Sequence, residues 1–315
     1  MLNSRIIIGA VLVLAVAFQT GCSGKDTPKN PDSSEAIKQE TKENSTVKQE
    51  DKQKTLMDEF NSLAVKDTKP AEAVGFINKN IPFLSNDNAS IVVNKLEEIQ
   101  KKKLPQLEEK FNGDKVQSEM SKVYKPGFDI SKIDNIADKE LKDLLLETRA
   151  GWYKVETAEG TYFPVIDYEA YKKYSSYAAP DIKAYIDIMS VESGKVPAKD
   201  AALVIGWDEV LKRALNQEKF ISQYPESVKI NDVKQLYKKY ISFVVFGTNN
   251  TPLFSYDSKT MADGAKSVYL KAVAGNENSK LLETLRMYLE VLKKGNYRLT
   301  EEVEKFRKSA YENML

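Results

Sequence analysis

The sequence GWYKVETAEGTYFPVIDYEAYKKY, residues 151–174, interrupts a chain that otherwise has the apolar spacing of helices. Within it, two runs rich in β-branched and aromatic residues flank Ala158-Glu159-Gly160. Gly160 can adopt the left-handed backbone conformation that a three-residue hairpin loop requires. We therefore expect a β-hairpin over residues 152–166, with residue 157 opposite residue 161.

This pairing decides which side chains of the hairpin face the core. The face that we expect to be buried carries Tyr153, Val155, Phe163 and Val165. The opposite face carries Trp152, Lys154, Glu156, Tyr162 and Ile166. Pro164 has no amide hydrogen to donate, so its strand should lie at a sheet edge. Because a lone hairpin is only marginally stable, it should pack against helices.

Apolar residues three and four positions apart predict helices on both sides of the hairpin. Thr55 and Asp58 form a capping box where the first helix is expected to begin, and Pro70 can start the second. A longer helix is expected over residues 88–111, where Pro105 should kink or split it. Further helices are expected at 135–149, 180–193, 198–222, 229–246, 257–274, 277–294 and 299–313, and a loop at 247–255.

The expected fold class is therefore mainly α. We expect an irregular helical bundle or an α-solenoid-like array with one small β-hairpin near residues 152–166. The hairpin is the natural boundary between two parts. These are an N-terminal helical half, residues 55–150, and the hairpin plus a C-terminal helical half, residues 151–315.

The first 22 residues have the pattern of an export signal. Arg5 precedes 13 apolar and small residues, whereas a membrane-spanning helix needs about 20. Thr20 and Gly21 then precede Cys22. These residues resemble the signal of bacterial lipoproteins, although Gln19 stands where Leu or Val is usual. The resemblance implies that residues 1–21 are a signal peptide and that Cys22 is lipidated.

The alternative is an ordinary secretory signal, with Cys22 as an incidental thiol. Cys22 is the only cysteine among 315 residues, so the chain cannot form an intramolecular disulfide. Residues 22–54 are almost entirely polar, and we expect them to be a lipid-anchored disordered tether. The expected location is the extracytoplasmic face of the cell membrane, to which the N-terminal lipid attaches the protein.

The composition excludes several kinds of chemistry. The chain has no histidine, which removes Ser-His-Asp catalysis and histidine-ligated zinc sites. It contains no glycine-rich nucleotide-binding motif, and we expect neither a cofactor nor a metal. The 47 basic and 46 acidic residues are balanced, so there is no basic surface that predicts nucleic-acid binding.

The hairpin region carries the candidate ligand-binding residues. Seven tyrosines lie between positions 153 and 185, and acidic residues follow the hairpin. The tyrosines either pack the hairpin onto helices or present a binding surface, because tyrosine combines an apolar ring with a hydroxyl. We place a candidate cleft at Trp152, Glu156, Tyr162, Asp167 and Tyr168.

Residues 151–174 also resemble uncharacterised lipoproteins of bacilli and related Gram-positive bacteria, which implies a location and no activity. Three functions stay open. The first is a non-enzymatic binding module for an envelope protein, a peptide or a wall polymer. The second is a hydrolase of cell-wall glycan that uses Glu156 or Glu159 as acid and Asp167 as base or nucleophile. The third is an assembly or folding factor for exported proteins, with an exposed apolar groove.

Overall fold

The computed structural model describes residues 34–125, 128–275 and 278–314, with the backbone alone for residues 34–49. The expected signal peptide, Cys22 and the first part of the tether lie outside these ranges. The chain divides into two units, residues 1–48 and residues 49–315. Within the described ranges, no helix is both long enough and apolar enough to cross a lipid bilayer.

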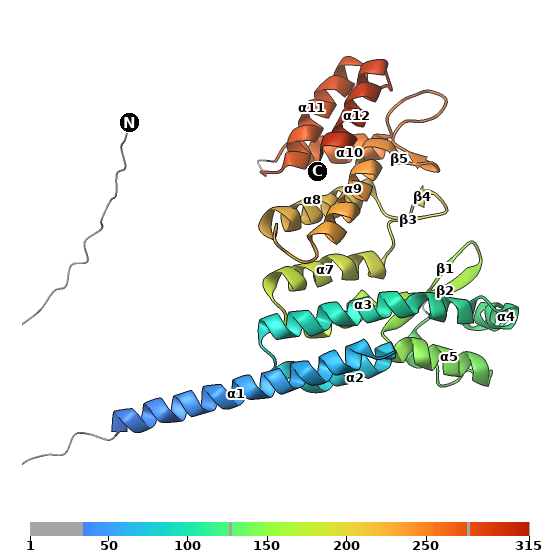
Figure 1. Cartoon of the computed structure of the whole chain (residues 1–315). Coiled ribbons are helices and arrows are strands. Elements are labelled where there is room, and N and C mark those ends of the chain that lie inside the picture. Colours follow the sequence, from blue (N-terminus) through green and yellow to red (C-terminus); the bar gives the residue numbers. More distant parts are fainter. Residues whose placement is uncertain (1–33, 126–127, 276–277, 315) are drawn as a thin grey trace, which may run out of the picture. The chain divides into compact units, whose positions relative to one another are not determined.

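The predicted fold class is confirmed, because the described chain is mainly helical with small hairpins (Figure 1). The helices before the first hairpin are α1 (Ser34–Val65), α2 (Pro70–Asn80), α3 (Asn86–Phe111), α4 (Asp114–Val123) and α5 (Lys139–Ala150). The hairpin consists of β1 (Tyr153–Ala158) and β2 (Thr161–Ile166). Next come α6 (Tyr168–Tyr171), the 3₁₀ turn η3 (Lys172–Tyr174) and α7 (Pro180–Gly194).

The remaining helices are α8 (Trp207–Gln223), α9 (Ile230–Phe246), α10 (Asp263–Val273), α11 (Lys280–Lys294) and α12 (Glu301–Asn313). Two short hairpins lie between them. One pairs β3 (Ala198–Lys199) with β4 (Ala202–Leu203), and the other pairs β5 (Gly247–Thr248) with β6 (Thr251–Pro252). The sequence predicts helix from residue 198, but the turn at Asp200 and Ala201 has positive φ at both residues, so the helix begins only at Trp207.

Several helix boundaries follow from local chemistry. Pro70 begins α2 as expected, and the Thr300 side chain accepts a hydrogen bond from the Val303 amide at the start of α12. Helix α3 continues through Pro105 without a break. The expected capping box at Thr55 is wrong, because Thr55 lies inside α1 and donates its hydroxyl to the Asp51 carbonyl one turn earlier. The part of the expected tether from Ser34 onward is helical.

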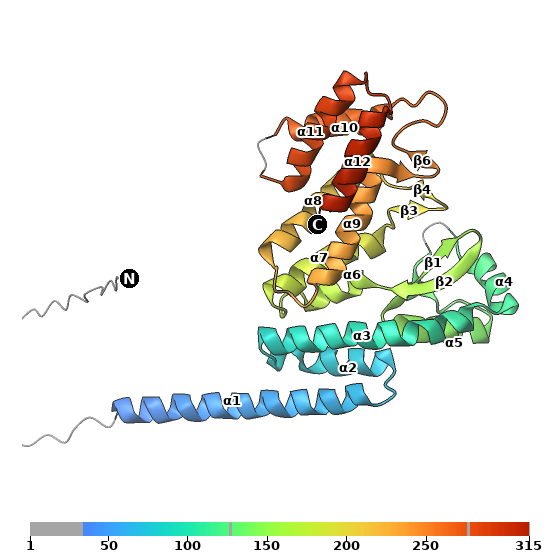
Figure 2. The same cartoon turned by 45° about the horizontal axis from the view of Figure 1, so that its top comes forward.

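The buried side chains of the second unit form two hydrophobic cores. The first core joins α1 to α5, the β1–β2 hairpin, α6 and α7. The second joins α8 to α12 and the β5–β6 region. Helices α8 and α9 contribute to both cores, because Phe220 and Val233 belong to the first and Val210 and Ile241 to the second. Helix α7 lies between α3 and α8 (Figure 2). The hairpin packs in the first core, together with the helices that precede it.

The hairpin is present, but its predicted register is wrong by one residue. Ala158 pairs with Thr161, which leaves a two-residue turn at Glu159 and Gly160. Both turn residues have positive φ, 50° and 76°, as a type I′ turn requires. A slip of one residue exchanges the faces of one strand relative to the other. Tyr153, Val155, Pro164 and Ile166 therefore share the buried face, and Phe163 and Val165 are only half-buried on the other.

The turn generates a prediction about stability. Glu159 occupies a left-handed conformation that Asn adopts more easily than Glu, because the short amide side chain tolerates positive φ. We expect Glu159→Asn to raise the free energy of unfolding by up to about 1 kcal/mol, and Gly160→Ala to lower it by about 1 kcal/mol. Urea denaturation measures both effects. A loss of stability in Glu159→Asn would contradict the two-residue turn.

Candidate functional site

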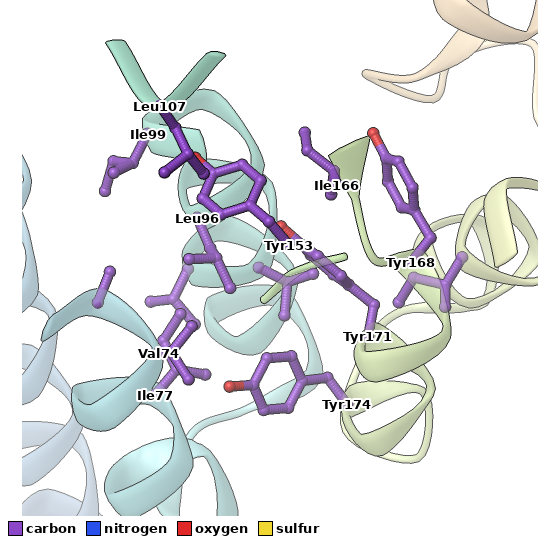
Figure 3. Close-up of a cluster of buried hydrophobic side chains, with 14 of the residues drawn as sticks. Val74, Ile77, Leu96, Ile99, Leu107, Tyr153, Ile166, Tyr168, Tyr171 and Tyr174 are labelled. Carbon is purple, nitrogen blue, oxygen red and sulfur yellow. The ribbon is translucent and has the colours of Figure 1, made fainter. Parts of the chain in front are cut away.

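Tyr168 and Trp152, two of the candidate ligand-binding residues, pack inside the protein. The Tyr168 ring is buried, and its hydroxyl donates to Glu97 Oε1 at 2.5 Å. Trp152 is half-buried and stacks on Tyr174, with 4.8 Å between ring centroids. These residues hold α6 and η3 against the first core, where Tyr153, Tyr171 and Tyr174 meet the aliphatic side chains of α2 and α3 (Figure 3).

Tyr162 supports the hairpin through its backbone rather than through its hydroxyl. Its amide donates to Gln117 Oε1 at 2.9 Å, and its carbonyl accepts from Gln117 Nε2 at 2.8 Å. The amide side chain of Gln117 thus pairs with the open edge of β2 as a neighbouring strand would. The Tyr162 ring is half-buried against Tyr124, with 5.1 Å between ring centroids.

Glu156 and Asp167, the two acidic candidates, are both engaged in local structure. Glu156 forms ion pairs with Lys199 at 3.2 Å and with Lys154 at 3.4 Å. Asp167 accepts a hydrogen bond from the Glu169 amide at the start of α6. Burial raises the pKa of Asp167, and the charge of Lys154 partly offsets this effect.

The spacing of these acids along the hairpin does not favour the carboxylate pair that a glycosidase needs. Glu156 lies opposite Phe163 in the hairpin, and Asp167 is four residues after Phe163. Four residues of extended chain span about 13 Å between Cα atoms. Glu159 lies still farther from Asp167, in the exposed turn. A glycosidase needs two carboxyl groups about 5–10 Å apart across an open cleft. The geometry of the hairpin therefore does not favour the hydrolase hypothesis.

Glu97 on α3 is the most strongly engaged ionisable group near the hairpin, and the sequence reasoning did not identify it. Its side chain is buried, and four donors surround it: the hydroxyls of Tyr168 and Tyr185 and the ammonium groups of Lys101 and Lys229. Lys229, itself buried, lies 2.5 Å from Glu97 Oε2. Burial alone raises the pKa of Glu97, but the charge of Lys229 and these hydrogen bonds outweigh it and lower the pKa to about 2.

One turn along α3, Gln100 makes a second set of buried contacts. Its side-chain Nε2 donates to the carbonyls of Gly151 and Trp152 at 2.7 and 3.2 Å, and its Oε1 accepts from the Tyr171 hydroxyl. Trp152 has a φ of 57°, a conformation that these contacts stabilise. Because every polar atom of Glu97 and Gln100 has a partner here, this cluster supports the fold rather than an open site.

An open site lies elsewhere, between α7 and α8. A groove with a volume of about 390 Å³ separates these helices, which is within the usual range for ligand sites. Ile188 and Val191 of α7 provide apolar surface, and Phe220 of α8, which is buried at 2% exposure, also lines the groove. Val191 is 42% exposed although it is aliphatic. The groove therefore combines a ligand-sized volume with accessible apolar surface.

The groove contains a buried amide without partners, Gln217. The residue is only 1% exposed, and neither Oε1 nor Nε2 has a hydrogen-bond partner in the described structure. Such an unpaired buried group destabilises a fold by about 1–3 kcal/mol. Gln217 is four residues after Arg213 and three before Phe220, so it lies on the stripe of α8 that faces α7.

One end of the groove is closed by buried ion pairs. Arg213 donates from Nε to Glu209 at 2.9 Å, and Glu192 accepts from the Tyr240 hydroxyl at 2.7 Å. Arg213 also lies 3.4 Å from Glu192. Burial raises the pKa of Glu192, with the Tyr240 hydrogen bond and the charge of Arg213 partly offsetting it. These groups are mutually satisfied, in contrast to Gln217.

A larger cavity of about 670 Å³ lies on the other flank of α8, against α9 and the start of α11. Its carboxylate, Glu218, already accepts hydrogen bonds from Ser279 and from the Leu281 amide, at 2.5 and 2.8 Å. None of the buried unpaired polar atoms in the described ranges belongs to its lining. The smaller α7–α8 groove is therefore the better candidate for a ligand site.

Comparisons with protein-family models, with curated proteins and with solved structures give no match for this chain. In the part of the chain that the structure describes, His, Cys, Asp and Glu side chains form no group of three or more that could hold a metal ion. The geometry of the α7–α8 groove is therefore the basis for inferring a function.

The Glu97 cluster generates a prediction about stability. Glu97→Gln leaves the buried ammonium of Lys229 without its counter-charge, so we expect the free energy of unfolding to fall by about 3 kcal/mol at pH 7. The pKa of Glu97 is below its ordinary value of 4.5, so this contribution is present above pH 4.5 and is lost as the pH falls towards 2. Urea denaturation should show that the difference in free energy of unfolding between wild type and variant becomes smaller over that pH range.

Lys229→Met provides the control for the same pair. We expect the double variant Glu97→Gln/Lys229→Met to lose less free energy of unfolding than the sum of the losses in the two single variants. The reason is that the double variant leaves no unpaired buried charge. Strictly additive losses in this cycle, or a difference that does not change between pH 7 and 2, would show that the ion pair does not stabilise the fold.

Proposed function

We propose that the protein is an extracytoplasmic interaction module that is attached to the membrane through a lipid on Cys22 and that binds an envelope component in the α7–α8 groove. The observation that carries the proposal is the buried, unpaired amide of Gln217 in a ligand-sized groove with apolar walls. Buried polar groups in folded proteins almost always have partners, so an unpaired one beside a groove indicates a place for a ligand.

The groove replaces the hairpin as the proposed binding surface. At the hairpin, the polar groups of Glu156 and Tyr168 already have protein partners, so a ligand would have to displace them. In the groove, the buried amide of Gln217 has no protein partner to lose, so a ligand that reaches it gains hydrogen bonds that the free protein lacks. The apolar side chain of Val191 adds surface that a partner can cover.

Photo-cross-linking tests the groove as a binding surface. We expect the full chain with p-benzoylphenylalanine in place of Val191 to form a discrete adduct in the intact bacterial envelope after irradiation. The matched control carries the same cross-linker in place of Leu270 of α10, which is equally exposed at 42%. Equal labelling at both positions, or no adduct at position 191, would contradict the proposal.

Lipid attachment has a separate test. The signal resembles that of lipoproteins, and Cys22 is the only cysteine available for acylation. We expect cells given a labelled fatty acid to label the wild-type chain and not Cys22→Ala. We expect Gln19→Leu, which restores the usual residue, to be processed at least as completely as wild type. Label in Cys22→Ala would show that the lipid, if any, is attached elsewhere.

A further inference from the structure

We infer that the α7–α8 groove binds an extended polypeptide segment, whose backbone amide pairs with the Gln217 side chain and whose apolar side chain packs on Ile188 and Val191. The inference rests on the proposed function, because it names the ligand class of the same groove. A primary amide has both a donor and an acceptor, and so does the backbone of each residue in a peptide.

The chain already contains this mode of recognition. Gln117 accepts a hydrogen bond from the Tyr162 amide and donates one to the Tyr162 carbonyl, at 2.9 and 2.8 Å. It thereby binds one residue of an extended strand, β2, along the edge that faces away from β1. Gln217 has the same side chain with both atoms unpaired, on the stripe of α8 that faces the groove. An extended segment in the groove would offer it the same pair of backbone groups.

The dimensions of the groove fit a short extended segment. The residues of α7 that line it run from Ala184 to Glu192, a rise of about 12 Å along the helix. An extended chain advances about 3.3 Å per residue, so about four residues lie along this length. The exposed side chain of Val191 lies near the Glu192 end of this length. In an extended segment every second side chain points to the same side, so one of them can contact Val191.

The charge of the groove favours a neutral ligand over an anionic wall polymer. Its lining carries three acidic residues, Asp187, Glu192 and Glu209, and three basic residues, Lys212, Arg213 and Lys219. Glu209 pairs with both Arg213 and Lys212, at 2.9 and 3.6 Å. The basic groups are therefore largely neutralised by the protein itself, and a polyanion would meet the three carboxylates as well.

The test uses the full chain in detergent and an array of heptapeptides of Ala, Leu, Val, Ser and Gln, blocked at both ends. The strongest binder is then measured in solution by fluorescence anisotropy. We expect Gln217→Leu to weaken it at least about tenfold, because two backbone hydrogen bonds are lost. Methylation of each peptide backbone nitrogen in turn should weaken binding to the wild-type protein by a similar factor at one position of the peptide and not at the others. Gln106→Leu, which changes an exposed glutamine on α3, should bind as wild type does.

Thermal unfolding separates binding from folding. Gln217→Leu removes an unpaired buried amide, so it should unfold at the same temperature as wild type or higher. Gln117→Leu removes paired atoms and should unfold at a lower temperature. If Gln217→Leu fails to fold, Gln217→Met and the N-methylated peptide on the wild-type protein provide the same comparison.

The outcomes distinguish the ligand class from the proposed function. Absence of peptide binding by the wild type, or equal binding by a folded Gln217→Leu, overturns the inference. If a soluble wall-glycan fragment binds instead and Gln217→Leu weakens it, the ligand class is wrong and the groove remains the binding surface. If the cross-linker at position 191 also gives no adduct in the envelope, the proposed function is wrong as well.

Discussion

A buried carboxylate, Glu97, constrains the arrangement of the first core. An isolated buried charge is strongly unfavourable, so its neighbours must supply hydrogen bonds and a counter-charge. Tyr168 of α6, Tyr185 of α7 and Lys229 at the start of α9 do so, and each of these contacts fixes an element against α3. The body of α9 packs in the second core, so the Glu97–Lys229 pair also connects the two cores. Because the hydroxyls of Tyr168 and Tyr185 donate to Glu97, few polar groups near the hairpin remain for a ligand.

The α7–α8 groove follows from this division into two cores. Helix α7 contributes its apolar side chains to the first core, and α8 contributes most of its own to the second. The groove between them is lined by apolar and charged residues, such as the half-buried Ile188 and the buried Arg213. Arg213 is satisfied by Glu192 and Glu209 at one end, and Gln217 has no corresponding partner farther along. A seam between two well-packed cores is thus a natural place for a ligand site.

Helix positions could be predicted from the sequence because apolar periodicity, Pro at a first turn and a Thr cap act locally, as at Pro70 and Thr300. The hairpin could be located for the same reason, but its register could not. The turn sequence at Glu159 and Gly160 fits a two-residue or a three-residue loop, and only the positive φ at Glu159 distinguishes them. This one-residue difference moved Tyr162 to the side of Val155 and moved Phe163 away from it.

The polar residues that matter most could not be predicted, because their importance depends on partners that are distant in sequence. Glu97 and Lys229 are 132 positions apart, and each alone resembles an ordinary charged residue on a helix. The two glutamines illustrate the same limit. Gln117 and Gln217 have identical side chains on amphipathic helices, but β2 satisfies the first and no described residue satisfies the second. A paired glutamine contributes to stability, whereas an unpaired one lowers it, so the position of Gln217 is explained more readily by binding than by folding.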